Sequence, residues 1–379
     1  MKSRKVFVLH FSPIELYPPA ANFLNFMARD SRELECYVIS SRCHLASKKD
    51  FIASSGNIHL IRTGTSFFAN SRFGRLCNYI SFYANSLFLI LWHRPSAVLY
   101  FETLSCLPAY LYRFLFNRKI DLLVHYHEYV STAEFVSGSR FFRFLWSLEK
   151  KLIRHASWIS HTNEERLKLF CNDYGIKMSH VCNVLPNYPP ASWLNTEILN
   201  VINSPVRLVY VGALGNETMY LQEFAAWVMR NSGKVTWDIF SVNPDADAVS
   251  LLDSINADNI SFKGSVEYEE LPTILRTYDV GLILYKGHIP NYINNAPNKL
   301  FEYHVSGLDV WFPSVMKGCF PYITSGSYPK IMAVDFEDLE KWHLNTAIDR
   351  NGLAMKLHHY SYEKVFPELL NALSLKKLK

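Results

Sequence analysis

Short apolar runs alternate with longer helical patterns along almost the whole chain of 379 residues. This alternation constrains the fold more than any other feature, because strands separated by helices of this length form a parallel sheet with helices on both faces. The first helix is predicted at 21–30. The strands predicted in the first half are 5–10, 34–40, 58–61, 97–101, 120–128, 157–160 and 180–186.

Residues 186–205 interrupt this alternation with four prolines and several polar turn residues, which is typical of a linker. The alternation then restarts. Strands are predicted at 206–212, 234–240, 259–264, 278–285 and 308–312, and helices at 217–231, 245–256, 268–277 and 297–306. The pattern predicts an α/β fold with two doubly wound, Rossmann-like domains that face each other across a cleft.

The predicted boundaries follow from the position of this linker. A first domain covers 1–188, the linker 189–205 and a second domain 206–355, and a helix at 356–379 is expected to pack back on the first domain. In doubly wound folds, ligands bind at the carboxyl ends of the strands. We therefore expect the functional residues to follow predicted strands and to line the cleft.

Composition excludes several classes of protein. Hydrophobic residues make up 49% of the chain, enough for large cores, and the net charge of +5 is too small to indicate a nucleic-acid partner. The seven cysteines are scattered without a CxxC pair, as expected for reduced thiols in the cytoplasm. The apolar start at 5–10 predicts a strand rather than a signal peptide, and the apolar stretch 80–92 is too short to span a bilayer.

The helix predicted at 297–306 has clear ends. Pro297 suits its first turn, where the missing N–H costs nothing, and Gly307 suits its end. Phe301, Val305 and Leu308 fall on one face at helical spacing and are expected to face the core.

Two charged residues fall on another face of this helix, Lys299 and Glu302. The helix follows a strand, so its amino end is expected at the carboxyl edge of the sheet. Free N–H groups, the helix dipole and a lysine together suit a diphosphate, whereas a glutamate suits the hydroxyl groups of a ribose. The alternative is an ordinary ion pair on a solvated face, and spacing alone favours that alternative.

The stretch PNKLFEY, followed by SGL, resembles the donor-binding segment of GT-B glycosyltransferases, especially family 4-like enzymes of the bacterial surface-polysaccharide type. The resemblance extends to the two-domain layout and covers most of the chain. It implies that Glu302 contacts the ribose of a nucleotide-sugar donor and that Lys299 contacts its diphosphate, with Asn298 in the same donor site.

The chain departs from the family pattern at three places. Asn294 stands where the family often has a second glutamate that meets the sugar hydroxyls, so this donor-site position is neutral. Asp309 stands where proline is common, and the loop 211–220 lacks the basic residues that often hold the diphosphate.

The loop VGALGN at 211–216 follows a predicted strand and opens a helix. Its glycines allow close approach of the backbone to a ligand, although a simple tight turn explains them equally well. The pattern is not GxGxxG, so a nicotinamide site has little support. In the resemblance this loop lies beside the donor phosphates, which assigns Gly212 and Asn216 to the donor site.

The segment HYHEYVS ends a strand of the first domain. His125 and His127 alternate with Tyr126 and are expected on one face, with Glu128 on the other. The histidine pair suits a metal, but no third ligand is evident nearby, and a structural histidine is the commoner explanation. Family 4-like enzymes often have a histidine followed by an acidic residue here. The resemblance therefore makes His127 and Glu128 the catalytic candidates, one of which orients or deprotonates an acceptor hydroxyl.

Other segments near predicted strand ends are less specific. Thr162 or Asn163 is expected to cap the next helix, and His161 is a secondary candidate for the cleft. The loop 10–22 is expected to shape an acceptor pocket.

The segment 139–155 interleaves aromatic and basic residues. Phe142, Leu145, Leu148 and Leu152 form an apolar stripe at helical spacing. A helix packed on the core with a solvated rim explains this pattern, and a helix at a membrane surface with anionic lipid is the alternative.

The resemblance implies a retaining transfer of a sugar from a nucleotide-sugar donor to the hydroxyl group of a lipid-linked glycan, without a cofactor or an essential metal. It also implies a cytoplasmic protein, peripheral on the inner face of the membrane. Two alternatives remain open, a nucleotide-sugar epimerase of the same fold and a non-catalytic subunit that binds a glycan or a nucleotide.

Overall fold

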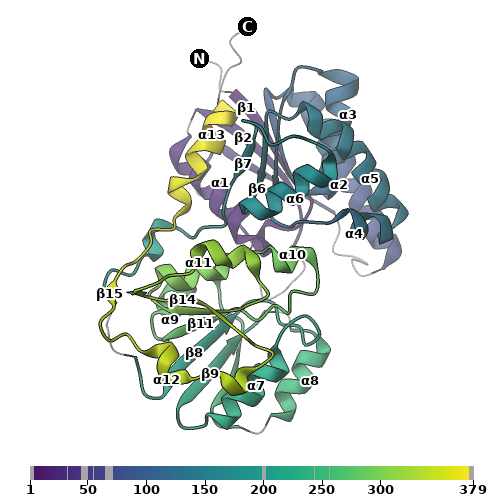
Figure 1. Ribbon diagram of the computed structural model, residues 1–379. Coiled ribbons are helices and arrows are strands. Elements are labelled where there is room, and N and C mark those ends of the chain that lie inside the picture. The colour runs from purple at the N-terminus through teal and green to yellow at the C-terminus, as the bar shows by residue number, and fades with distance from the viewer. Residues whose placement is uncertain are drawn as a thin grey trace. The chain divides into compact units, whose positions relative to one another are not determined.

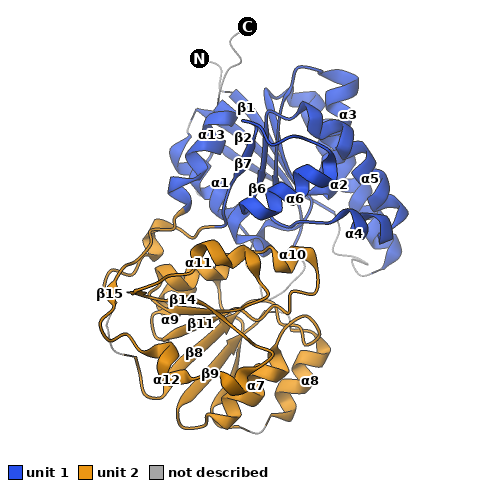
Figure 2. Ribbon diagram, viewed as in Figure 1, with its two compact units in different colours: residues 1–187, 362–379 blue, residues 188–361 orange. Residues whose placement is uncertain are grey.

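The computed structural model describes residues 4–31, 33–43, 50–53, 55–64, 71–198, 202–242, 244–255 and 257–374. The chain divides into two compact units, each with its own parallel sheet (Figure 2). The first consists of residues 1–187 and 362–379, and the second of residues 188–361. The predicted α/β class with two parallel sheets is confirmed.

The sheet of the first unit has seven parallel strands in the order β3-β2-β1-β4-β5-β6-β7 (Figure 1). Each strand was predicted, although β5 and β7 are shorter than expected. The strands are β1 (Arg4–His10), β2 (Leu34–Ser41), β3 (Ile58–Thr63), β4 (Ala97–Phe101), β5 (Asp121–Tyr126), β6 (Trp158–His161) and β7 (Cys182–Val184).

Helices cover both faces of this sheet, and the period of two along β1 shows how. Phe7 and Leu9 point to the face covered by α2, α3, α5 and α6, whereas Val6 and Val8 point to the face covered by α1 and α13. The helices are α1 (Pro18–Asp30), α2 (Arg72–His93), α3 (Cys106–Leu111), α4 (Thr132–Ser137), α5 (Arg140–Leu152), α6 (Glu164–Tyr174) and α13 (Phe366–Ser374).

Helix α13 comes from the C-terminal end of the chain and packs on α1. The ring of Phe366 lies 5.3 Å from that of Phe23 and 5.7 Å from that of Phe26, between ring centroids. Residues 375–379 of the predicted C-terminal helix lie outside the described residues.

The sheet of the second unit has six parallel strands in the order β10-β9-β8-β11-β12-β14. Strand β14 was not predicted. The strands are β8 (Val206–Val211), β9 (Val235–Phe240), β10 (Ile260–Gly264), β11 (Val280–Leu282), β12 (Asp309–Pro313) and β14 (Ile331–Val334), and a separate pair is formed by β13 (Ser327–Tyr328) and β15 (Ala354–Met355).

Helices also cover both faces of the second sheet, with α7, α8 and α12 on one face and α9 and α11 on the other. They are α7 (Leu221–Arg230), α8 (Ala246–Ser254), α9 (Leu271–Leu275), α10 (Pro290–Ile293), α11 (Asn298–Val305) and α12 (Leu344–Ile348). Part of the Pro-rich segment packs against α11, because the backbone N–H of Asn195 donates to the Val305 carbonyl at 2.8 Å. Residues 199–201 of this segment lie outside the described residues.

The segment predicted at 139–155 forms α5, and its apolar stripe faces the core. Leu145 and Leu152 are fully buried, and Phe142 and Leu148 are partly buried. Over the described ranges, no helix is both long and apolar enough to cross a membrane.

Candidate functional site

Helix α11 of the second unit carries the best-defined group of candidate residues. Pro297 is its N-cap residue, one position before the first helical turn where it was expected. Gly307 follows the helix with φ +96°, a conformation that favours glycine, and Leu308 N–H donates to the Tyr303 carbonyl at 3.1 Å. The glycine predicted at the helix end is therefore confirmed.

Helix α11 is buried on all sides. Phe301, Val305 and Leu308 face the core as predicted, but Lys299 and Glu302 are also only 8% and 5% exposed. The alternative of a solvated ion pair is therefore wrong. The close packing depends on Gly281 of β11, where a Cβ atom would collide with the ring of Tyr303.

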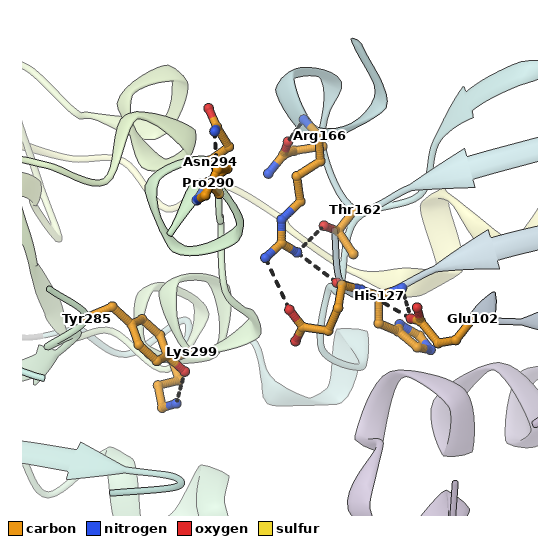
Figure 3. Close-up of polar contacts among 10 residues, drawn as sticks. Glu102, His127, Thr162, Arg166, Tyr285, Pro290, Asn294 and Lys299 are labelled. Atoms are coloured by element: carbon orange, nitrogen blue, oxygen red, sulfur yellow. Dashed lines mark hydrogen bonds and ion pairs between the residues drawn. The ribbon is translucent and has the colours of Figure 1, made fainter. Parts of the chain in front are cut away.

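Lys299 is a buried cation that lies between tyrosine side chains. Its Nζ lies 3.4 Å from the Tyr285 hydroxyl (Figure 3). The same atom lies 5.3 Å from the centroid of the Tyr210 ring. A Cβ atom on Gly212 would fall 2.5 Å from Nζ, so the glycine makes room for the lysine. No carboxylate among the described residues forms an ion pair with it.

The charge of Lys299 makes an anion the natural ligand. Burial alone would lower the pKa of Lys299, but Tyr210, Tyr285 and Glu302 raise it above its ordinary value, so the side chain stays charged at neutral pH. A buried charge without a counter-ion is costly. Together with the free N–H groups at the start of α11, it can bind a group such as a diphosphate.

Glu302 lies one turn further along α11. Its Oε1 accepts a hydrogen bond from Nδ2 of Asn298 at 2.8 Å. Burial raises the pKa of Glu302 from 4.5 to about 7, although Asn298, Lys299 and Tyr268 oppose this shift. The carboxyl group is therefore partly protonated at neutral pH, and a cation or a hydrogen-bond donor beside it would favour the charged form.

Two predicted donor residues have hydrogen-bond partners of their own. Nδ2 of Asn294 donates to the Pro290 carbonyl at 2.9 Å and closes the short helix α10 (Figure 3). The backbone N–H of Asn216 donates to Oδ2 of Asp245 at 3.2 Å. The structure therefore brings together Gly212 with Lys299 and Asn298 with Glu302, and it gives Asn294 and Asn216 separate local contacts.

The first unit has a second group of candidates, where β5 ends. His125 and His127 lie on the same side of the strand, with ring centroids 4.6 Å apart, as predicted. The ring of His127 also stacks on Phe101 at 5.2 Å. Burial, and then the neighbouring histidines, lower the pKa of His127 well below its ordinary value, so its ring is neutral at neutral pH.

Arg166 connects the two catalytic candidates, and sequence reasoning missed it. This buried side chain of α6 donates from Nη1 to the His127 carbonyl at 2.7 Å and lies 3.4 Å from Oε2 of Glu128, which is half exposed (Figure 3). The helix is capped by Asn163, whose Oδ1 accepts from the Arg166 N–H at 2.9 Å, as predicted. A positive charge in the first turn of a helix is unfavourable because of the helix dipole. The arginine at this position is therefore the sequence feature that could have identified Arg166 as a functional candidate.

Glu102, which follows β4 directly and which sequence reasoning also missed, supports the same turn. One of its carboxyl oxygens accepts from the backbone N–H of His127 at 2.6 Å and from that of Glu128 at 3.2 Å (Figure 3). Burial, and then the charge of Glu128, raise the pKa of Glu102 to about 8. Its φ of +60° is unusual for a residue other than glycine and is a sign of a functional constraint.

The other two candidate histidines, His125 and His161, have structural contacts. Nδ1 of His125 lies 2.9 Å from the Ser160 hydroxyl, and the ring of His161 stacks on Tyr126 within the core. In the part of the chain that the structure describes, no three His, Cys, Asp or Glu side chains are grouped to hold a metal. A cavity of about 10 Å³, room for about one water molecule, borders His125, His127 and Asn187.

No protein-family model and no curated protein sequence matches the chain. Several solved structures, in contrast, are similar to the chain over almost its whole length. The lipopolysaccharide outer core galactosyltransferase WaaB superposes with a TM-score of 0.62 at 13% identity, over 98% of this chain and 99% of that one. Anabaena HepE in complex with UDP and glucose superposes with a TM-score of 0.65 at 11% identity, over 98% of this chain and 99% of that one. The chain has the GT-B fold.

A third similar structure has a different chemistry. The UDP-GlcNAc 2-epimerase from Methanocaldococcus jannaschii gives a TM-score of 0.57 at 11% identity, over 98% of this chain and 99% of that one. At such identities the likeness shows the fold alone. The predicted GT-B fold class is confirmed, and the function has to be argued from the two groups of residues described above.

Proposed function

We propose that the chain is a glycosyltransferase that moves a sugar from a nucleotide-diphosphate donor to a hydroxyl group of a glycan. The observation that carries this proposal is the buried, unpaired charge of Lys299 at the start of α11, one turn before Glu302. A nucleotide diphosphate has a dianionic group beside a ribose diol. It therefore needs a cation and a carboxylate at this spacing.

In the proposed reaction, Lys299 and the N–H groups of α11 stabilise the negative charge that develops on the departing diphosphate. Glu302 accepts hydrogen bonds from the ribose hydroxyls, with Asn298 holding its carboxyl group. The bound UDP and glucose of HepE, a protein of the same fold, support a nucleotide-sugar donor. We expect transfer with retention of configuration and without an essential metal.

The acceptor hydroxyl is assigned to the turn after β5. The neutral ring of His127 can orient it through a hydrogen bond, and Glu128, a half-exposed carboxylate held by Arg166, can accept its proton. Glu102 fixes the backbone of both residues and acts as a positioning residue.

We place the reaction in bacterial surface-polysaccharide synthesis, with a family 4-like enzyme at the cytoplasmic face of the inner membrane and a lipid-linked glycan as acceptor. Two observations support this part of the proposal. The galactosyltransferase WaaB, which has the same fold, acts on the lipopolysaccharide outer core. Helix α5 also exposes Phe141 and Phe144 beside Arg140 and Arg143.

A transfer assay tests this proposal. The protein is incubated with UDP-, GDP-, CMP- and dTDP-sugars and with lipid-linked glycan acceptors, and nucleotide release and the mass of the glycan are measured. We expect one donor to release its nucleotide as the glycan gains one sugar. His127→Ala should abolish transfer, whereas His180→Ala, an exposed histidine of the same unit, should not. The absence of release from every donor contradicts the proposal.

A nucleotide-sugar epimerase is the second candidate, because the structure adds a carboxyl group that this chemistry needs. Glu102 lies beside Glu128, and its raised pKa suits an acid or base near neutral pH. The epimerase of the same fold supports this reading. Proton NMR of the donor distinguishes the two reactions, because an epimerase inverts one sugar carbon in the absence of any acceptor.

A non-catalytic subunit is the third candidate. The neutral Asn294 and the absence of Lys or Arg from the sequence at 211–220 favour it. Such a subunit would bind the nucleotide with no release of sugar in the same assay.

A further inference from the structure

Helix α2 of the first unit has an outer face that is apolar where a surface helix is ordinarily polar. Its 22 residues bury Phe82, Ser86 and Ile90 against the sheet. The opposite side, at the same spacing of four, carries an exposed row of apolar side chains, with the exposed Asn85 beside it. We call this row, Leu76, Ile80, Ala84, Phe88 and Trp92, the outer face of α2.

The exposure of this face is large. Trp92 is 74% exposed and Phe88 61%, and their rings stack on each other with centroids 6.2 Å apart. Leu115 and Phe116, which follow α3 in a turn that packs against α2, add two more exposed apolar side chains. Exposed apolar area of this extent marks an interaction surface.

An apolar groove continues this surface towards α5, which lies on the same side of the sheet as α2 (Figure 1). The ring of Phe141 on α5 lies 5.0 Å from that of Tyr79 on α2, between centroids. The groove has a volume of about 440 Å³, and Arg72 and Arg75 are among the residues that line it. A hydrocarbon chain fits such a groove, and an anionic group fits beside its arginines.

The charge of these two helices is of one sign. Together α2 and α5 contain six Lys and Arg residues and a single acidic residue, Glu149. Glu149 is fully buried and accepts hydrogen bonds from the hydroxyls of Tyr126 and Tyr174. The solvent-facing charges of both helices are therefore all positive, although the whole chain has a net charge of only +5.

We propose that the outer face of α2, with the groove beside it, binds the surface of a bilayer that contains anionic lipids. Phe88, Trp92 and their apolar neighbours enter the acyl region, and Arg72 and Arg75 meet the lipid phosphates. A 22-residue helix is about 33 Å long and lies flat on the interface rather than crossing it. A second copy of the chain is a poor partner, because a symmetric contact would bring these arginines together.

Vesicle sedimentation with the full chain tests the proposal, using phosphatidylcholine vesicles with and without phosphatidylglycerol. Binding is expected only to the anionic vesicles, and it should weaken as salt is added. F88S/W92S should lower the affinity at least tenfold and R72Q/R75Q about 25-fold, at roughly one factor of five for each arginine. The matched control is F262S/F320S in the second unit, where the two phenylalanines are 47% and 45% exposed.

Tryptophan fluorescence gives a second readout, which begins with the native protein. Vesicles with brominated acyl chains should quench the fluorescence of the native protein, and W92F should lose most of that quenching. Equal binding by all variants, or no binding to anionic vesicles, overturns the proposal. A dimer in light scattering that F88S/W92S converts to monomer, without vesicle binding, assigns the face to a second copy instead. None of these measurements uses a sugar donor, so their outcome is independent of the proposed transferase activity.

Discussion

Replacing Glu302 by glutamine should stabilise the protein above neutral pH and weaken nucleotide binding at the same time. Burial raises the pKa of this carboxyl group from 4.5 to about 7. Such a change corresponds to about 3 kcal/mol of free energy between the two protonation states. The folded protein therefore carries a cost for ionising Glu302 that the unfolded chain does not.

The sign of the effect follows from proton binding. Below pH 4.5 the carboxyl group is neutral in both states, and its full contribution to stability is present. Between pH 4.5 and about 7 the unfolded chain loses the proton while the folded protein keeps it, so the free energy of unfolding falls as the pH rises. Above pH 7 the loss stays near its full value of about 3 kcal/mol.

Glutamine has the same shape and no charge, so Glu302→Gln should remove this dependence. Urea unfolding at pH 5 and pH 8 measures it. We expect the variant to match the native protein at pH 5 within about 1 kcal/mol and to exceed it at pH 8 by about 3 kcal/mol. Glu340→Gln, at an exposed position of the same unit, is the control and should show no such difference. Parallel profiles for the native protein and Glu302→Gln would refute the reasoning.

Three further predictions concern neighbouring positions. Gly212→Ala places a Cβ atom on Nζ of Lys299, so calorimetry should show at least a tenfold loss of nucleotide affinity; unchanged affinity speaks against this placement of the lysine. Gly281→Ala collides with Tyr303 and should lower the free energy of unfolding by about 2–3 kcal/mol in urea, and a stable variant would mean that the helix can shift. Glu102→Gln should remove an inflection near pH 8 from the pH–rate profile of sugar transfer, and an unchanged profile would assign that inflection to another group.

The fold was predictable because proline, glycine and apolar periodicity mark the ends of most strands and helices. The ends of α11 followed from Pro297 and Gly307 to within one residue. Strand β14 was missed because four residues, Ile331 to Val334, are too short to stand out from their surroundings.

The site was predictable only in part, because its contacts join distant parts of the chain. The spacing of Lys299 and Glu302 predicted a solvated face. The helix is buried instead because Tyr303 packs closely against Gly281. The periodicity of the sequence does not show this contact. Glu102 supports a residue 25 positions further along the chain. No local sequence pattern predicts a contact between residues so far apart in the chain.

The most direct test of the account is a calorimetric titration with UDP, GDP, CMP and dTDP, carried out on the native protein and on Lys299→Met. Methionine keeps the apolar length of the side chain and removes the buried charge, so the fold should be retained. The account predicts that one nucleotide binds and that Lys299→Met weakens it about 100-fold. Lys286→Ala, which loses the ion pair with Glu223 and the contact with the Tyr220 ring, should bind as the native protein does. Binding that survives in Lys299→Met, or no binding of any nucleotide to the native protein, would contradict the donor site at α11.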